Sequence, residues 1–312
     1  MVPSRNGYGV GLKEAGERDP RVVALCCDLT ESTRTIDFAN AFPDRFVQVG
    51  IAEQNMISVA SGMAAMGKIA FTASYAMFSP GRSWEQIRTT VCYNDSNVKI
   101  IGAHAGISVG PDGATHQAIE DMAIMRALPN MVVIAPADHI EAKKATLAAA
   151  SYIGPVYIRI GREKTPVVTT DESPFIIGKA ELFFDRDPRH EKTVGIVVTG
   201  TLAHSALVAA HTLQEAGIGA SVLHMPTIKP LDTDALTTFG AEHELIVTVE
   251  EHQIIGGLGS AVAEFFAGTM PKRVVRVGIN DVFGQSGEPD ELLTYYKLDA
   301  ASIVARIKQL FL

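Results

Sequence analysis

Short apolar runs that alternate with stretches of helical period constrain the fold of this chain more than any other feature. The run from Val22 to Asp28 is continuously apolar and ends in a carboxylate, as expected of a strand buried on both faces of a parallel sheet. The alternation predicts an α/β fold, a doubly wound domain with a mostly parallel sheet that binds ligands at the carboxyl ends of its strands. Further strands are predicted at 69–71, 98–101, 131–134 and 156–158, and helices at 52–66, 82–93, 117–127 and 138–150.

A charged, proline-containing patch at residues 185–192 interrupts this pattern and is typical of a linker. It divides the chain into a first domain at 1–184 and a smaller second α/β domain at 193–312. Strands of the second domain are predicted at 194–198, 220–223, 245–249 and 274–277, and helices at 203–216, 258–267 and 300–311.

The composition excludes several classes of function. The 312 residues, of which 47% are hydrophobic and 20% charged, describe a globular chain long enough for two domains. A formal net charge of −8 argues against general binding of nucleic acid or of anionic membranes, so local cations must hold any anionic substrate. Because the sequence shows neither a secretion signal nor an apolar stretch long enough to span a membrane, we expect a cytoplasmic protein without membrane association.

The three cysteines fit an intracellular protein. Cys26 and Cys27 are adjacent in a predicted strand, where their side chains point to opposite faces, and Cys92 stands alone in the sequence. None has the spacing of a metal ligand, so we interpret them as small core residues and expect no metal site on this chain.

The glycine-rich turn at 256–260 follows a predicted strand and precedes a helix, which is the position of a phosphate-binding loop. A single glycine-rich turn is a weak signal, and turn geometry or packing explains it more readily.

The stretch GIAEQN at residues 50–55 places an acidic residue at the predicted start of a helix. A carboxylate in the first turn, such as that of Glu53, is stabilised by the free backbone amides and the helix dipole by about 0.3–1 kcal/mol. Taken alone, Glu53 is therefore a good helix-start residue.

Two further stretches follow it, SYAMF at 74–78 and HAGISVGPDGATHQ at 104–117. In this order the three stretches resemble the pyrimidine-binding domain of thiamine-diphosphate enzymes of the transketolase family, and residues 193–312 resemble the transketolase C-terminal domain. The resemblance implies that Glu53 hydrogen-bonds a ring nitrogen of the cofactor's aminopyrimidine, while the cofactor itself carries the chemistry.

Tyr75 and Phe78 lie three residues apart in a strand-to-helix connection, where aromatic residues are ordinarily part of the core. The resemblance implies instead that they form the slot that stacks against the aminopyrimidine, with Phe78 the closer match. The family usually has a further tyrosine shortly afterwards, where this chain has residues 80–82, PGR, so the slot is built differently. Asp28 resembles a cofactor-site aspartate.

The loop from His104 to His116 contains three glycines and Asp112, and it cannot form a regular element. Its two histidines and one aspartate match no standard zinc spacing. The resemblance implies that His104 and His116 are catalytic and contact the donor and acceptor sugars, and that Asp112 contacts the hydroxyl beside the reacting carbon. Histidine suits this task because it can change charge or donate two hydrogen bonds near neutral pH.

Arg5, Ser32 and Arg162 would ordinarily be solvated surface residues. They match positions at which transketolases bind the phosphate of a sugar-phosphate substrate. A guanidinium group binds phosphate through two parallel hydrogen bonds, which lets an acidic protein hold an anionic substrate.

The chain has no GDG motif followed by an asparagine, the segment that holds the metal on the cofactor diphosphate in this family. Residues 111–113, PDG, come nearest and belong to the histidine loop. We therefore expect Mg²⁺ or Ca²⁺ to be bound by a separate N-terminal transketolase subunit, in a 2+2 heterotetramer that transfers two-carbon ketol units between ketose and aldose phosphates.

Other hypotheses stay open. The beta subunit of a 2-oxo-acid dehydrogenase has the same two domains and a GIAEQ-like stretch, but it needs neither the phosphate-binding residues nor the DGATHQ loop. A 1-deoxyxylulose-5-phosphate synthase shares the latter loop but is ordinarily one long chain. A catalytically silent transketolase-like subunit would not require an intact Glu53.

Overall fold

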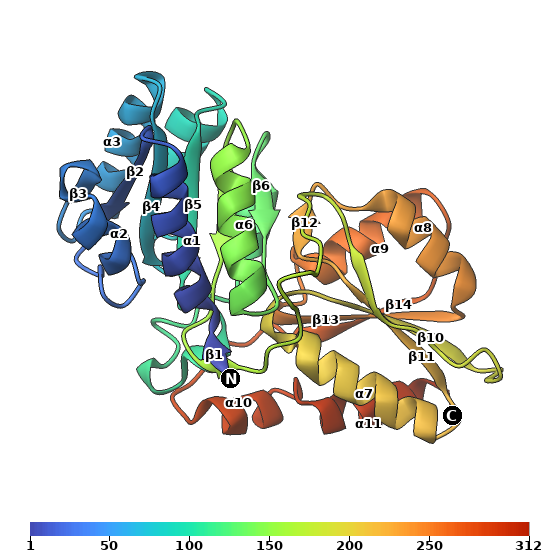
Figure 1. Cartoon of the computed structure of the whole chain (residues 1–312). Helices are drawn as coiled ribbons and strands as arrows, with labels where there is room; N and C mark the ends of the chain where they lie inside the picture. Colours follow the sequence, from blue (N-terminus) through green and yellow to red (C-terminus); the bar gives the residue numbers. More distant parts are fainter. Residues whose placement is uncertain (312) are drawn as a thin grey trace.

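The computed structural model describes residues 1–311, which form two α/β domains that pack against each other (Figure 1). The predicted fold class is confirmed. Each domain is built on a mostly parallel sheet that carries helices on both faces, and the N-terminus lies close to where the domains meet.

The first sheet has seven strands in the order β12-β6-β7-β5-β4-β2-β3, and all neighbours are parallel except the edge pair β12 and β6. Its central strands are mostly apolar and almost completely buried, as the sequence predicted. The strands are β2 (Val22–Cys26), β3 (Phe46–Gln48), β4 (Ile69–Tyr75), β5 (Val98–Ala103), β6 (Val132–Ile134), β7 (Val156–Arg159) and β12 (Thr227–Lys229); β1 (Val2–Pro3) and β8 (Lys164–Thr165) form a separate pair.

Helices cover both faces of this sheet, and each face has its own apolar core. One core includes Tyr8, Phe38 and Ala145, and the other includes Ile57, Val91 and Met125. The first face carries α1 (Ser4–Arg18), α2 (Ile36–Ala41) and α6 (His139–Ser151); the second carries α3 (Glu53–Ala65), α4 (Trp84–Gln86), the π-helical turn η2 (Ile87–Cys92) and α5 (Asp121–Arg126).

Helix α1 was not predicted, because its glycines disfavour a helix and weaken the apolar periodicity. The structure shows why they are there. A Cβ on Gly7 would overlap the backbone carbonyl of His139, and one on Gly11 would press on Lys143, so the glycines let α1 lie directly against α6 (Figure 1). Close packing outweighs the poor helix propensity of the segment.

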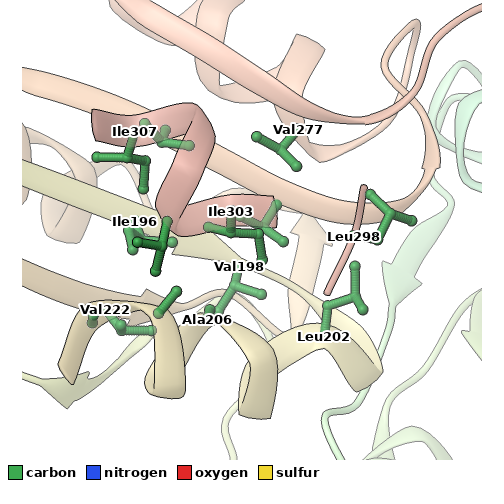
Figure 2. Packing of buried hydrophobic residues seen from close by; sticks show 14 of the residues in the cluster. Ile196, Val198, Leu202, Ala206, Val222, Val277, Leu298, Ile303 and Ile307 are labelled. Carbon is green, nitrogen blue, oxygen red and sulfur yellow. The ribbon is translucent and has the colours of Figure 1, made fainter. Parts of the chain in front are cut away.

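The second sheet has five strands in the order β14-β13-β10-β11-β9. Ile196, Val198 and Val222 project from it against α7 and α11, as Figure 2 shows, while α8 and α9 cover the other face. The elements are β9 (Glu181–Phe184), β10 (Thr193–Val198), β11 (Gly219–His224), β13 (Leu245–Gln253), β14 (Val274–Ile279), α7 (Ala203–Glu215), α8 (Thr233–Glu242), α9 (Leu258–Gly268), α10 (Pro289–Tyr295) and α11 (Ala300–Leu310).

The strand pairing corrects the predicted domain boundary at residues 184 and 185. Strand β9 pairs with β11 in the second sheet, so residues 185–192 form a connection within the second domain. Strand β12, from the second half of the chain, completes the edge of the first sheet. A surface turn between two strands and an interdomain linker have the same polar composition, so sequence could not separate them. No helix in residues 1–311 is long and apolar enough to cross a membrane.

Candidate active site

Glu53 is the first residue of α3, as predicted, and its side chain is buried with 3% exposure. The hydroxyl of Ser74, on β4, donates a hydrogen bond to Oε1 over 3.2 Å. Nη1 of Arg82 forms an ion pair with Oε2, also at 3.2 Å. The carboxylate is thus fixed from two sides, at the carboxyl end of a central strand.

Aromatic rings line the space beside Glu53. The ring centroids of Tyr75 and Phe78 lie 5.9 Å apart with an interplanar angle of 24°, and Tyr75 stacks on His104 at 4.1 Å. The His116 ring meets Phe78 edge-on at 5.4 Å. The predicted cofactor residues Tyr75 and Phe78 and the predicted catalytic residues His104 and His116 therefore form one cluster of rings.

His104 is buried, and its backbone has a positive φ of 53° just after β5. Its Nε2 lies 3.0 Å from Nη1 of Arg5. Nε2 also lies 3.2 Å from the carbonyl oxygen of Ser32, so it faces both a donor and an acceptor, and Nδ1 is buried without a hydrogen-bond partner among residues 1–311. Burial, and next the charge of Arg5, lower the pKa of His104 to about 3. Histidine can change charge near neutral pH, but this low pKa keeps His104 neutral there.

A group of guanidinium groups adjoins His104. Arg5 donates to the carbonyl oxygen of Ser32 over 2.9 Å. Burial lowers the pKa of Arg5, and the neighbouring charges of Arg34 and Arg162 lower it further. The backbone N–H of Gly161 donates to Ser4 Oγ over 2.8 Å and brings the start of α1 beside Arg162. The structure thus gathers the predicted phosphate-binding residues, and it adds Arg34, which the sequence analysis missed.

Arg162 also holds the histidine loop. It forms an ion pair with Asp112 at 3.1 Å and donates to the carbonyl oxygen of Val109 over 3.0 Å. At the end of the loop, Nδ1 of His116 lies 2.9 Å from the hydroxyl of Thr115. The loop contains a short 3-10 segment, η3 (Ile107–Asp112), which is broken by a positive φ at Gly110. Asp112 and Arg162, both predicted to contact substrate, therefore also contact each other.

Asp28 stands apart from this group. It follows β2 with a positive φ of 55°, is exposed, and donates its backbone N–H to Oε1 of Gln48 over 2.7 Å. Within residues 1–311, no side-chain hydrogen bond or ion pair joins Asp28 to the other predicted site residues.

Residues of the second domain contact the histidine loop and hold it in place. The buried side chain of Gln117 donates to the carbonyl oxygen of Gln285 over 2.9 Å, and Glu251 accepts from the backbone N–H of Ser108 over 2.6 Å. Gly113 has a positive φ of 74°, and a Cβ there would press on Ser286. The second-domain residues of these contacts, Glu251, Gln285 and Ser286, come from segments without a recognisable motif, so sequence reasoning could not find them.

A buried ion pair lies beneath the same loop. Nε of Arg159, on β7, is 2.9 Å from Oδ2 of Asp121, and the Tyr157 hydroxyl donates to the same oxygen over 2.7 Å. Arg159 also donates to the carbonyl oxygens of Ala118 and Glu251, so it links the loop, the first sheet and the second domain.

The glycine-rich turn at 256–260 does not present a free anion site. The backbone N–H groups of Leu258 and Gly259, at the start of α9, donate to the Glu250 carboxylate over 2.7 Å each. Glu250 is buried and occupies the position a phosphate would take.

The residues around Glu53 fit a planar, nitrogen-bearing group. The guanidinium of Arg82 lies over the Phe78 ring, 4.3 Å from its centroid, while it pairs with Glu53. The space beside Phe78 therefore admits a flat group that hydrogen-bonds the carboxylate, as an aminopyrimidine would. In the part of the chain that the structure describes, no group of three or more His, Cys, Asp and Glu residues is placed to hold a metal ion.

Comparison with known proteins agrees with this architecture. The transketolase pyrimidine-binding domain matches residues 1–167, and the transketolase C-terminal domain matches residues 186–303. A putative transketolase C-terminal section from Methanocaldococcus jannaschii is 48% identical over 98% of this chain and 95% of its own length. A 6-deoxy-6-sulfo-D-fructose transketolase subunit from a Clostridium species is 39% identical over 96% of this chain and 92% of its own length.

A longer relative and a solved structure are also similar to this chain over nearly its whole length. The transketolase of Rattus norvegicus is 34% identical over 99% of this chain, which spans 49% of that protein. A solved structure described as an inactive beta4 tetramer of a split-gene transketolase has a TM-score of 0.89 and 43% identity, covering 99% of this chain and 97% of the other. The chain belongs to the transketolase family.

Proposed function

We propose that this chain is the C-terminal subunit of a thiamine-diphosphate-dependent transketolase made of two subunits. The observation that carries the proposal is the buried Glu53 at the start of α3, next to the stacked, half-buried rings of Tyr75 and Phe78. Similarity to separately encoded transketolase subunits supports it. The enzyme would transfer a two-carbon ketol unit between ketose and aldose phosphates.

Each site residue has a role in this proposal. Glu53 would hold a proton at the ring nitrogen of the aminopyrimidine, while Ser74 keeps the carboxylate oriented. Phe78 and Tyr75 would stack on and position the cofactor, which supplies the acidic carbon that carries the transferred unit. His104 and His116, whose rings both lie against Tyr75, would contact the sugar.

The cations beside His104 would bind the phosphate of the sugar. Arg5 donates to the carbonyl oxygen of Ser32, and Arg162 and Arg34 add two further positive charges beside it. A concentration of guanidinium groups on a protein of net charge −8 is most simply explained by an anionic ligand.

Replacing Arg5 or Arg162 by alanine is expected to raise KM for sugar phosphates by about 10- to 150-fold, the loss of one charge-assisted hydrogen-bonded pair of roughly 1.5–3 kcal/mol. KM is measured by steady-state kinetics with a phosphorylated donor and with hydroxypyruvate, which has no phosphate. Cofactor binding should hardly change. Equal losses with both donors would mean that the arginines only support the loop.

The proposal requires a partner. The chain spans about half of single-chain transketolases such as that of Rattus norvegicus, and residues 1–311 contain no cluster that would hold the metal of a diphosphate. We infer that the partner subunit supplies the metal and diphosphate ligands, with Mg²⁺ or Ca²⁺ as the ion, and that two copies of each subunit assemble.

The proposal is tested by complementation. The purified chain alone should bind thiamine diphosphate weakly and show no ketol transfer, because the metal-bound diphosphate is missing its ligands. Affinity purification through a tag on this chain should recover a second subunit, and the recovered assembly with cofactor and magnesium should be active. Ketol transfer by the chain alone would contradict the proposal.

A further inference from the structure

Arg82 provides the counter-charge of a buried carboxylate. The Glu53 side chain is 3% exposed, and Arg82 is the only cation within ion-pair distance of it among residues 1–311. A buried carboxylate without a partner is strongly disfavoured. Ser74 bonds only Oε1, so Arg82 stabilises the buried charge at Oε2 until another donor takes its place.

The guanidinium also occupies a defined position on Phe78. Its central carbon lies 4.3 Å from the ring centroid while Nη1 reaches Oε2 of Glu53 at 3.2 Å. A guanidinium is flat, stacks on aromatic rings and carries N–H groups at its edge. An aminopyrimidine is also flat with nitrogen atoms at its edge, and in the proposed function it takes the same two partners. Both groups cannot stack on this part of Phe78 and bond Glu53 together.

Arg82 is also able to leave. Its side chain is 52% exposed, and Glu53 is the one carboxylate with which it pairs in the part of the chain that the structure describes. Water competes for an arginine at such a position, so the pair is held weakly. When Arg82 leaves, Ser74 still bonds Oε1 of Glu53, but Oε2 loses its side-chain partner and is open to a new donor.

We propose that Arg82 is a removable counter-ion: it stacks on Phe78 and pairs with Glu53 before cofactor binding, and the aminopyrimidine displaces it. This rests on the proposed function, because the displacing group is the thiamine cofactor. The cofactor then binds only the fraction of molecules in which Arg82 has moved away, and its apparent affinity is reduced by that fraction.

Replacing Arg82 by glutamine removes the competitor. The assembly of this chain with its partner should then bind thiamine diphosphate about 3- to 10-fold more tightly than wild type, mostly through faster association. Arg82→Lys keeps the charge but lacks the flat guanidinium, so its affinity should lie between the two. Arg88→Gln is the matched control, since Arg88 is exposed and forms no ion pair within residues 1–311, and it should behave as wild type.

The dissociation constant is measured by calorimetry with thiamine diphosphate and magnesium, the association rate by stopped-flow fluorescence, and the integrity of each variant by its melting temperature. Equal affinity of Arg82→Gln and wild type would overturn the proposal, because Arg82 would then not compete. Weaker binding by Arg82→Gln would also overturn it, because Arg82 would then contact the bound cofactor. Failure of the wild-type assembly to bind the cofactor is a different result and would refute the proposed function itself.

Discussion

Replacing Glu53 by glutamine is expected to slow hydrogen–deuterium exchange at the acidic carbon of bound thiamine diphosphate by about 10²- to 10⁴-fold, the usual size of a lost acid–base contribution. Glutamine has nearly the same size and can still accept a hydrogen bond from Ser74, but it cannot exchange a proton with the aminopyrimidine nitrogen. The exchange rate is measured by NMR in the assembly with partner, cofactor and magnesium. The fold should survive, because the loss of a first-turn carboxylate costs about 1 kcal/mol or less.

The control for this variant is Glu291→Gln, which also removes a carboxylate from the first turn of a helix, α10, outside the candidate site. It should leave the exchange rate unchanged. If Glu53→Gln exchanged the proton within about threefold of wild type at a similar melting temperature, Glu53 would be a helix-start residue only, and the thiamine assignment would lose its foundation.

Arg159→Met is expected to lower the free energy of unfolding by about 3–5 kcal/mol, because it leaves the buried carboxylate of Asp121 without its cation. The Tyr157 hydroxyl would be the remaining side-chain donor to Asp121. The carbonyl oxygens of Ala118 and Glu251 would lose a donor at the same time. Urea unfolding followed by circular dichroism measures the change.

Arg21→Met serves as the comparison, since Arg21 pairs with Asp19 at the protein surface, where its side chain is 64% exposed. Its unfolding midpoint should stay at the wild-type value. Adding Asp121→Asn to Arg159→Met should restore part of the lost stability, because a neutral amide is easier to bury than an unpaired carboxylate. No recovery in the double variant would mean that the backbone hydrogen bonds of Arg159 dominate.

The parts of the fold that depend on local sequence pattern were predictable. Continuous apolar runs gave the central strands of both sheets, and the start of α3 at Glu53 followed from an acidic residue before an apolar-periodic stretch. The free, buried cysteines were also expected from their apolar surroundings. The predicted helix at 117–127 begins later, at Asp121, because Gln117 is used to anchor the histidine loop.

The parts that depend on contacts between distant segments were not predictable. Helix α1 forms because its glycines fit against α6, and nothing within residues 4–18 announces that neighbour. The partition of β9 and β12 between the sheets is likewise set by long-range pairing. For the candidate site, the resemblance named the residues that the structure gathers around Tyr75 and Arg5, but not Ser74, Arg82 or Arg34.

The charge state of His104 likewise depends on distant contacts that the sequence could not predict. Histidine has an ordinary pKa close to neutrality, and the sequence gives no reason to expect otherwise. Burial is the main cause of its low pKa, and the charge of Arg5, on a helix about a hundred positions earlier in the chain, lowers the pKa further. A residue that looks pH-sensitive in the sequence is therefore held neutral at neutral pH in the folded protein.

Strand β12 ties the second half of the chain to the first sheet through backbone pairing. It leaves the second domain, pairs with β6 and thereby closes an edge that the first sheet would otherwise expose. A fragment that ended at residue 167, where the pyrimidine-binding domain match stops, would carry an open strand edge ready to pair with other chains. Excising that domain for separate study would therefore produce an aggregation-prone piece, although the two halves are distinct domains by sequence.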